Sequence, residues 1–467
     1  MIQLLLVEDE DLAVENFMET LTLTGVETEI MVAKSRDHAL HALATCDLDL
    51  IVCDLVIPST DGVLDASVNH GFAVHAAARA QMPGVPAIFL TGYPEERGIH
   101  DSLSDGPVAQ IYGPAKIPLV RLVAKGDVDA LLSCLKLYLE SLSGLQEVEV
   151  ECQGATDPES MLVRACQHYV ATIGGLRAVL VPFGGSSGAE VGRLEVTLDG
   201  GFKRTLVVKT QSMDRVGREQ DAYEQHVPTS LASGYFAPAV TPQLYGLRRS
   251  GANLYALASG GRNLFDVLRA DPQAAAALVH RMASMHAPWT AHSVHRSQSI
   301  GELRRTRNRT PRTDALVAAD SDLSAIESRS MDLAFCTCHG DLHGANVVVG
   351  DSGDPQLIDF GDVGFGLSAL DPITLELSLL FNPSGPLHGT ESPPLELSEW
   401  HDVKSYCSQS PYFPFIQACR AWAQEVSDQD TLLVTAYVHS MRQLKYSDVP
   451  ARVPAELARG IASAIRR

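Results

Sequence analysis

The stretch CHGDLHGANVVVG, residues 338–350, places two histidines, an aspartate and an asparagine within eight positions, directly before an apolar run. A second stretch, QLIDFGD (356–362), follows after the turn-forming DSGDP. This pattern predicts a loop at 339–346, a strand at 347–350 and a return strand at 356–360. Such a hairpin would bring Asp359 beside Asn346.

These two stretches carry the groups that phosphoryl transfer to an alcohol requires. One carboxylate must lie near the attacking hydroxyl, and a second carboxylate and an amide oxygen must hold Mg²⁺. Asp341, Asp359 and Asn346 supply these three groups.

HGDLHGAN followed by LIDFGD resembles the aminoglycoside phosphotransferase and choline kinase superfamily, a branch of the protein-kinase-like fold. The resemblance covers roughly residues 175–460 and implies an α+β two-lobed domain that uses ATP and Mg²⁺. It implies Asp341 as the catalytic base, with Asn346 and Asp359 as Mg²⁺ ligands. His339 and His343 are expected to hold the loop by hydrogen bonds, and Asp362 to support it or contact substrate.

A glycine-rich stretch upstream fits the smaller lobe. Residues 176–210 alternate apolar runs with glycine breaks, which is typical of an antiparallel meander. A lysine two strands after a glycine-rich turn is where a kinase-like lobe holds phosphates, which gives Lys209. An acidic partner should lie on the next helix, and we choose Glu219 over Glu224, although spacing does not separate them. The resemblance implies a phosphate-covering turn and a hinge: Gly185, Ser186, Ser187 and Gly188 for the turn, and 254–261 for the hinge.

The first 145 residues alternate apolar runs with helical segments, the pattern of a doubly wound parallel α/β sheet. The predicted strands are 2–7, 48–55, 86–92 and 120–125, with helices at 12–23 and 70–81 between them. Functional groups collect at the carboxyl ends of such strands. These ends carry Glu8, Asp9, Asp54, Thr91 and Lys125. Converging carboxylates repel one another unless a cation intervenes, and Mg²⁺ with oxygen ligands removes that conflict.

LLVEDE, DLVIP, FLTG and the late lysine make residues 1–140 resemble a response-regulator receiver domain, a flavodoxin-like fold. The resemblance implies Asp54 as phosphoacceptor and ligand of a Mg²⁺ that Glu8 and Asp9 also bind, with Thr91 and Lys125 as the switch pair. Two positions depart from the family: Gly126 replaces a proline, and the aromatic switch position falls on Leu122. A receiver-like fold that no longer accepts phosphate is the weaker alternative, because every acidic group is present.

Composition limits the remaining possibilities. The formal charge of −21, from 36 Lys+Arg against 57 Asp+Glu, disfavours nucleic-acid binding. We expect no signal peptide and no membrane span, and nine scattered cysteines fit a reducing cytoplasm.

The local stretch GELRRTRNRTPRT (301–313) is basic; it is a solvated loop, an anionic-substrate contact or a docking site for the receiver. Residues 365–381 are predicted to form a buried helix of the C-lobe. Trp400 and Trp422, with Tyr412 and Phe413, wall a pocket or pack in the core.

The sequence therefore predicts a receiver domain (1–145), a linker (146–160), an N-lobe (161–262) and a C-lobe (263–467). A histidine kinase or phosphotransfer protein would phosphorylate Asp54, which controls an ATP-dependent phosphotransferase acting on an unknown hydroxyl. A homodimer through the receiver is a further expectation. Two alternatives stay open: a nucleotide-binding pseudokinase scaffold, and a protein Ser/Thr kinase. The sequence does not tell whether phosphorylation activates or inhibits.

Overall fold

The computed structural model describes residues 1–92, 103, 107–154, 157–183, 189–257, 262–307 and 309–466. The chain forms two compact units. The first comprises Met1–Gly217 and Pro238–Leu257, and the second comprises Arg218–Ala237 and Ala258–Arg467.

The first unit begins with a five-stranded, fully parallel sheet in the order β2-β1-β3-β4-β7. This is the flavodoxin-like 2-1-3-4-5 order, and it confirms the doubly wound α/β prediction. Its strands are β1 (Ile2–Val7), β2 (Thr28–Ala33), β3 (Leu50–Asp54), β4 (Ala87–Thr91) and β7 (Val120–Ala124). Its helices are α1 (Asp11–Thr22), α2 (Arg36–Thr45), α3 (Val68–Gln81) and α5 (Val128–Gln146).

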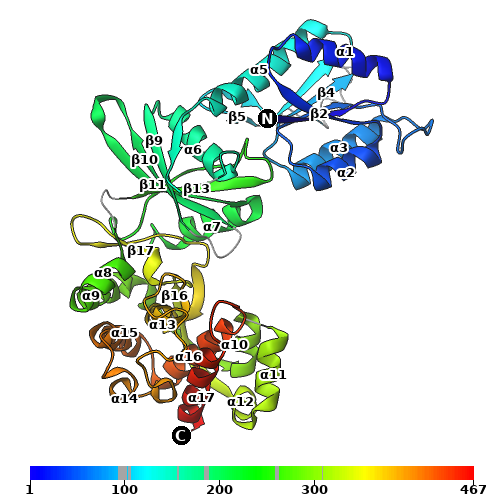
Figure 1. Cartoon of the computed structure of the whole chain (residues 1–467). Helices are drawn as coiled ribbons and strands as arrows, with labels where there is room; N and C mark the ends of the chain where they lie inside the picture. Colours follow the sequence, from blue (N-terminus) through cyan, green and yellow to red (C-terminus); the bar gives the residue numbers. More distant parts are fainter. Residues whose placement is uncertain are drawn as a thin grey trace. The chain divides into compact units, whose positions relative to one another are not determined.

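Apolar side chains cover both faces of this sheet, which explains why its strands are continuous apolar runs. Helices α1 and α5 cover one face, and α2 and α3 cover the other (Figure 1). Between β4 and β7, the described part of the chain forms a hairpin of β5 (Val108–Gln110) and β6 (Lys116–Pro118).

A six-stranded sheet follows in the order β12-β13-β11-β10-β9-β8. Its strands are β8 (Val150–Cys152), β9 (Arg177–Phe183), β10 (Glu190–Thr197), β11 (Lys203–Ser212), β12 (Ala239–Gln243) and β13 (Ser250–Leu257). The predicted meander is confirmed, since β9, β10 and β11 pair antiparallel in sequence order. The middle of the stretch predicted as a linker forms β8, which pairs parallel to β9. Helix α6 (Met161–Thr172) packs its apolar side on this sheet.

A buried carboxylate joins the two sheets of the first unit. Asp49 immediately precedes β3, and its Oδ1 accepts hydrogen bonds from Arg164 Nη1 of α6 at 2.5 Å and from Arg248 Nε at 2.9 Å. Its Oδ2 accepts from Arg248 Nη2 at 3.0 Å and from the backbone N–H of Gln3 at 3.0 Å. Arg248 lies in the turn between β12 and β13. We call Asp49, Arg164 and Arg248 the Asp49 clamp.

The second unit is mainly helical, with two small three-stranded sheets in its described part. Its strands are β14 (Arg262–Asn263), β17 (Val347–Val349) and β18 (Pro355–Leu357) in one sheet, and β15 (Val294–Ser299), β16 (Ser330–Cys338) and β19 (Gly364–Leu367) in the other. Its helices are α8 (Leu264–Ala270), α9 (Pro272–Thr290), α10 (Ile300–Arg307), α11 (Pro311–Ala319), α12 (Ser321–Glu327), α13 (Leu370–Phe381), α14 (Val403–Cys407), α15 (Phe413–Val426), α16 (Gln429–Gln443) and α17 (Arg452–Arg466). Helix α7 (Met213–His226) crosses the boundary between the units.

Two expectations for this unit are resolved. The segment 365–381 was expected to be one helix, but it begins in β19 and becomes helical only at Leu370, because residues 364–367 pair with β16. Trp400 and Trp422 are fully buried and therefore pack in the core. The Trp400 indole donates to Glu376 Oε1 at 2.8 Å, and the guanidinium of Arg420 lies 3.4 Å from the Trp400 ring centroid.

Among the described helices, none combines the length and the apolar character that crossing a bilayer requires.

Candidate functional sites

Three carboxylates gather at the carboxyl edge of the parallel sheet. Glu8 and Asp9 follow β1, and Asp54 is the last residue of β3. Their ligand oxygens lie within 4.8 Å of one another, and Glu8 and Asp54 are each only 2% exposed. Burial raises the pKa of Asp54 and of Glu8, although the charge of Lys125 opposes the shift at both groups. The positive charge of one lysine therefore does not neutralise the three carboxylates. A site whose ligand atoms are all oxygens fits Mg²⁺.

Lys125 lies directly beside this acidic cluster. Its Nζ is 2.6 Å from Asp54 Oδ2 and 3.4 Å from Glu8 Oε2. Burial works to lower the pKa of Lys125, but the hydrogen bond and charge of Asp54 outweigh it and raise that pKa. The ammonium is thus held charged where a phosphoryl group on Asp54 would develop negative charge.

The two departures from the receiver pattern have structural counterparts. Gly126 adopts a φ of +91°, a left-handed turn that glycine takes readily between β7 and α5. Leu122 is half-buried against the core on the α2–α3 face of the sheet.

Thr91 ends β4 and is buried, and its carbonyl accepts from the backbone N–H of Lys125 at 2.7 Å. The structure thus brings Thr91 and Lys125 to one edge, and their switch roles stay predictions.

The predicted phosphate-binding lysine lies within a central strand. Lys209 is on β11, between β10 and β13, where it pairs with Val191 and with Asn253. It is only 7% exposed, which separates it from an ordinary surface lysine at a strand end. The strand continues for three residues beyond Lys209, to Ser212.

Burial also separates the two candidate partners on α7. Glu219 is 1% exposed. Glu224 is exposed, and its Oε1 accepts from Gln220 Nε2 at 2.5 Å. A buried carboxylate needs a compensating partner, so Glu219 is favoured, and its pairing with Lys209 stays a prediction. Gly185, Ser186, Ser187 and Gly188, and the hinge residues 258–261, lie outside the described residues.

The loop after β16 is fixed by buried polar contacts. The backbone N–H groups of His339 and Gly340 donate to the two carboxylate oxygens of Asp371, at 2.7 and 3.0 Å. The His339 ring is fully buried, and its Nε2 lies 3.1 Å from the carbonyl oxygen of Ile358. Gly340 has a φ of +85°, and a Cβ there would lie 2.2 Å from the carbonyl oxygen of Asp362. His339 thus has the structural contacts that the sequence predicts.

The three residues expected to perform the chemistry are Asp341 and Asn346, on this loop, and Asp359, which follows the hairpin of β17 and β18. Asn346 Nδ2 donates to the carbonyl of Asp341 at 2.9 Å, which leaves the amide oxygen of Asn346 for a cation. The predicted hairpin of β17 and β18 is confirmed, and the backbone N–H of Ile358 donates to the carbonyl of Asn346 at 3.1 Å. Asp359 follows immediately with a φ of +66°, a left-handed conformation that is uncommon outside glycine.

Asp341 itself is open to a substrate. Its carboxylate is 40% exposed and, within the described residues, accepts no hydrogen bond. The ring nitrogen Nε2 of His343 lies 3.8 Å from Asp341 Oδ2. Burial lowers the pKa of His343, although the charges of Asp341 and Asp359 act against this shift.

Sequence reasoning missed Asp371, the residue that holds the loop. It lies 32 and 31 positions beyond the two amides that it binds, at the start of the buried helix α13. His286 Nε2 lies 3.7 Å from its Oδ2, and burial lowers the pKa of His286 to about 4. The one available signal was an aspartate before Pro372 in an otherwise apolar run, which predicts a helix start rather than a support.

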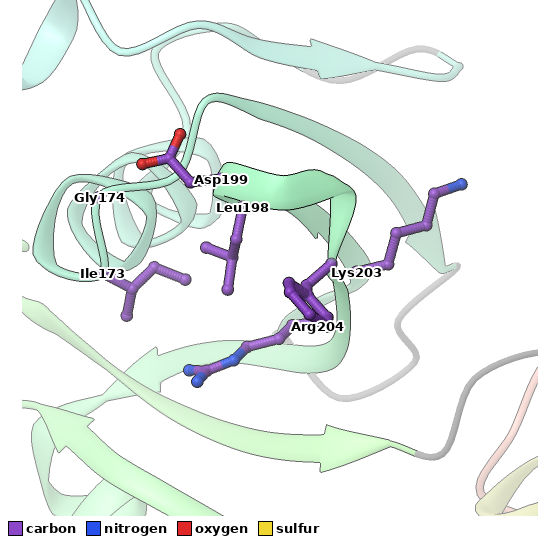
Figure 2. A pocket seen from close by; sticks show the side chains of 7 residues that line it. Ile173, Gly174, Leu198, Asp199, Lys203 and Arg204 are labelled. Atoms are coloured by element: carbon purple, nitrogen blue, oxygen red, sulfur yellow. The ribbon is translucent and has the colours of Figure 1, made fainter.

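An open hollow of about 450 Å³ lies away from these residues. It is formed by the end of α6 and the turn before β11, and Arg204 points into it while Lys203 extends outward (Figure 2). Lys203 begins β11, six residues before Lys209, which corresponds to roughly 20 Å of strand. The hollow is therefore separate from the predicted phosphate site.

Residues 242–382 match the phosphotransferase enzyme family. No curated protein matches the chain.

Several solved structures are similar to parts of this chain. A thermostable mutant of aminoglycoside phosphotransferase APH(4)-Ia, in a ternary complex with ADP and hygromycin B, is 13% identical; the match covers 64% of this chain and 96% of that one, with a TM-score of 0.39. The signal receiver domain of an HD domain-containing protein from Pseudomonas fluorescens Pf-5 is 24% identical, over 31% and 98% of the two chains, with a TM-score of 0.23. The receiver domain of a sensor histidine kinase from Pseudomonas aeruginosa PAO1, with magnesium in its active-site cleft, is 20% identical, over 30% and 98%, with a TM-score of 0.23.

Proposed function

We propose that this protein is a response regulator whose receiver domain controls an ATP- and Mg²⁺-dependent phosphotransferase. The observation that carries the proposal is Asp341, an exposed carboxylate without a hydrogen bond in the described chain, on a loop that the carboxylate of Asp371 and the side chain of Asn346 fix. A rigid loop with one free carboxylate is suited to general-base catalysis.

In the phosphotransferase, the acceptor hydroxyl oxygen would bond to the γ-phosphorus of ATP while the bond from that phosphorus to the β–γ bridging oxygen breaks. ADP leaves, and Asp341 takes the hydroxyl proton. Asn346 and Asp359 would hold Mg²⁺, which supplies charge neutralisation when bound, and Lys209 would contact the phosphates. The acceptor is a hydroxyl compound, and aminoglycosides are only one class among the alcohols to be tested.

In the receiver, Asp54 would take a phosphoryl group from a phosphohistidine of a histidine kinase or phosphotransfer protein. The phosphorus–nitrogen bond breaks as a bond to an Asp54 oxygen forms. Glu8, Asp9 and Asp54 would hold Mg²⁺, and Lys125 and Thr91 would contact the new phosphate. Nine free thiols in the structure fit the reducing cytoplasm, where we place this reaction.

The two activities have a physical link within the first unit. Strand β3 carries Asp54 at its last position, and Asp49 lies immediately before its first. Asp49 binds Arg164 and Arg248 of the neighbouring sheet region. A change at Asp54 therefore acts on a strand whose other end is bonded to the part of the protein that carries Lys209.

The test follows ADP formation and label transfer from labelled Mg²⁺-ATP, with and without acetyl phosphate as a small phosphodonor. We expect Asp341→Asn to lower ADP formation about 100-fold or more. Asp351→Asn, an exposed carboxylate in the neighbouring hairpin, is the matched control and should leave it unchanged. Asp54→Asn should abolish the effect of acetyl phosphate.

Three outcomes would overturn parts of the proposal. ATP binding without turnover, even with a panel of alcohols, would favour a nucleotide-binding scaffold. Label transferred to a protein would favour a Ser/Thr kinase. Turnover that acetyl phosphate changes equally in Asp54→Asn would remove the receiver from control.

A further inference from the structure

One buried tyrosine contacts both elements that carry the predicted catalytic residues. Tyr235 lies between α7 and β12 in the sequence and is fully buried. Its carbonyl accepts from the backbone N–H of Leu357 at 2.8 Å, and the carbonyl of Leu357 accepts from the backbone N–H of Ala237 at 2.9 Å. Leu357 ends β18, two residues before Asp359. The backbone of this segment is therefore bonded to the hairpin that precedes a predicted Mg²⁺ ligand.

The side chain of Tyr235 contacts a histidine on α9. Its hydroxyl forms a hydrogen bond with His286 Nδ1, which also lies 3.1 Å from the carbonyl oxygen of Met282. The other ring nitrogen, Nε2, has no hydrogen-bond partner among the described residues and lies 3.7 Å from Asp371 Oδ2. Asp371 is the carboxylate that accepts from two backbone amides of the catalytic loop. Two contacts therefore connect the Tyr235 hydroxyl to the group that holds this loop.

The imidazole of His286 is packed in one orientation. The residue is only 2% exposed, and its ring centroid lies 5.3 Å from that of Trp289 and 4.8 Å from that of Trp422. In a close-packed interior the ring cannot turn without displacing these indoles. Packing therefore directs Nε2 toward Asp371, and the property that remains to be set is which nitrogen carries the proton.

Burial sets the protonation states of the two side chains. Burial lowers the pKa of His286 to about 4, although the charge of Asp371 opposes this shift. Burial, and then the charge of Asp371, raise the pKa of Tyr235 well above its ordinary value. At neutral pH the imidazole is therefore neutral with a single N–H, and the hydroxyl keeps the proton that it can donate.

The two tautomers of His286 present different groups to Asp371. With the proton on Nδ1, the ring donates to the Met282 carbonyl and turns the lone pair of Nε2 toward a carboxylate, which is repulsive. With the proton on Nε2, the N–H faces the carboxylate, and Nδ1 accepts from the Tyr235 hydroxyl. The hydrogen bond that one ring nitrogen makes selects the tautomer. The Tyr235 hydroxyl thus favours the form that stabilises the charge of Asp371.

We propose that Tyr235 is a positioning residue for phosphoryl transfer: its hydroxyl donates to His286 Nδ1 and thereby keeps an N–H on Nε2 against Asp371. The inference rests on the proposed phosphotransferase activity. Asp371 in turn holds the loop that carries Asp341, and a small displacement of a catalytic group costs much of its effect. Because the backbone of Tyr235 also holds the hairpin before Asp359, one residue supports the predicted base and a predicted metal ligand.

A purely structural tyrosine is the rival explanation, and Tyr437 supplies the matched control. Tyr437 is also fully buried, and its hydroxyl donates to Glu327 Oε1 at 2.8 Å. Tyr235→Phe and Tyr437→Phe each remove one buried hydrogen bond, so both should lower the Tm of the full chain. Only Tyr235→Phe should also lower kcat, by about tenfold, with the KM for ATP unchanged. A wild-type kcat in Tyr235→Phe overturns the proposal.

Two measurements test whether the effect passes through His286 and Asp371. In an Asp371→Asn background, Tyr235→Phe should cause no further loss of kcat, because the carboxylate that it acts on is already gone. Nitrogen NMR of the imidazole ring should place the proton of His286 on Nε2 in the wild type and on Nδ1 in Tyr235→Phe. Additive losses of kcat, or the same tautomer in both proteins, overturn the proposal.

Substitutions of His286 test the same link if Tyr235→Phe does not fold. A glutamine amide can keep an N–H near the position of Nε2, whereas methionine is a flexible apolar side chain without a donor. His286→Gln should therefore retain more turnover than His286→Met, at a similar Tm. Equal turnover in the two variants overturns the proposal.

A further measurement is independent of turnover. Hydrogen exchange of peptides that cover residues 339–346 should be faster in Tyr235→Phe than in the wild type and unchanged in Tyr437→Phe. Unchanged exchange in Tyr235→Phe overturns the proposal. If no form of the protein turned over ATP while the exchange responded as expected, the proposed activity would be refuted, and Tyr235 would still position the loop.

Discussion

Asp49→Ala removes the centre of the Asp49 clamp and should weaken the first unit. The carboxylate accepts three hydrogen bonds from two arginines and one from the Gln3 amide, and its side chain is completely buried. At about 1.5–3 kcal/mol for each charged hydrogen bond, a simple sum over the arginines would exceed 4 kcal/mol. Such bonds are not additive, and Arg248 is 15% exposed and can turn to water. We therefore expect a loss of about 3–5 kcal/mol, the cost of leaving buried charges without a partner.

The assay uses the distribution of aromatic residues. All three tryptophans, Trp289, Trp400 and Trp422, belong to the second unit, so their fluorescence in urea reports on that unit alone. Hydrogen exchange of peptides that cover β3 and β13 reports on the first unit. Asp49→Ala should speed exchange in those peptides and leave the tryptophan transition near its wild-type midpoint.

Asp49→Asn is the graded control. It keeps the shape and an acceptor but loses the charge, so its effect should lie between the wild type and alanine. Acetyl phosphate should still label Asp54 in Asp49→Ala, but the label should no longer change ATP turnover. If Asp49→Ala showed wild-type exchange rates in β3 and an intact response to acetyl phosphate, the clamp would not connect Asp54 to ATP turnover.

Three further outcomes are expected. Burial acts to raise the pKa of Asp49, but the hydrogen bonds and charges of Arg248 and Arg164 outweigh it and lower that pKa. The clamp's stabilisation is therefore present above the unfolded-state pKa of about 3.9 and is lost as pH falls through the folded-state pKa; β3 peptides with equal protection factors at pH 6 and pH 3, after correction for intrinsic exchange, would contradict this. Gly246→Ala should resemble Asp49→Ala in exchange, because the added Cβ would lie 2.1 Å from the Ile111 carbonyl oxygen at a φ of +76°; Gly144→Ala, in open space, is its control. Asp371→Asn should lower kcat about 10–100-fold with little change in the KM for ATP, since it loosens the catalytic loop; a change in KM alone would argue against it.

Much of the fold could be predicted because local patterns of apolar and turn-forming residues determine it. Buried parallel strands are apolar runs, so β1, β3 and β4 were found within about two residues. The hairpin of β17 and β18 was predicted from an apolar run, a turn and a second run. The segment 365–381 failed because β19 consists of glycines and apolar residues that fit either element, and its strand pairing depends on β16, some thirty residues earlier.

The supporting groups of the sites could not be predicted, because each depends on distant pairings. Asp49 looks like an ordinary residue at the start of a strand, and its partners lie 115 and 199 positions away. Arg304 belongs to the basic stretch that could equally have been a solvated loop. Only the fold shows that its side chain is buried and paired with Glu327. Motif residues reveal the chemistry, whereas the contacts that fix them are visible only in three dimensions.

The route from Asp54 to the phosphotransferase can be followed through backbone pairings within the first unit. Asp49 binds Arg248, which lies two residues before β13, and the register places Asn253 of β13 directly opposite Lys209 of β11. Asn253, which faces the predicted phosphate-binding lysine, therefore lies five positions after the arginine of the clamp. A displacement at Asp49 would reach Lys209 along a hydrogen-bonded strand pair, which transmits movement because it is close-packed and cannot deform freely. It follows that receiver phosphorylation should act on the binding of the ATP phosphates rather than on recognition of the acceptor.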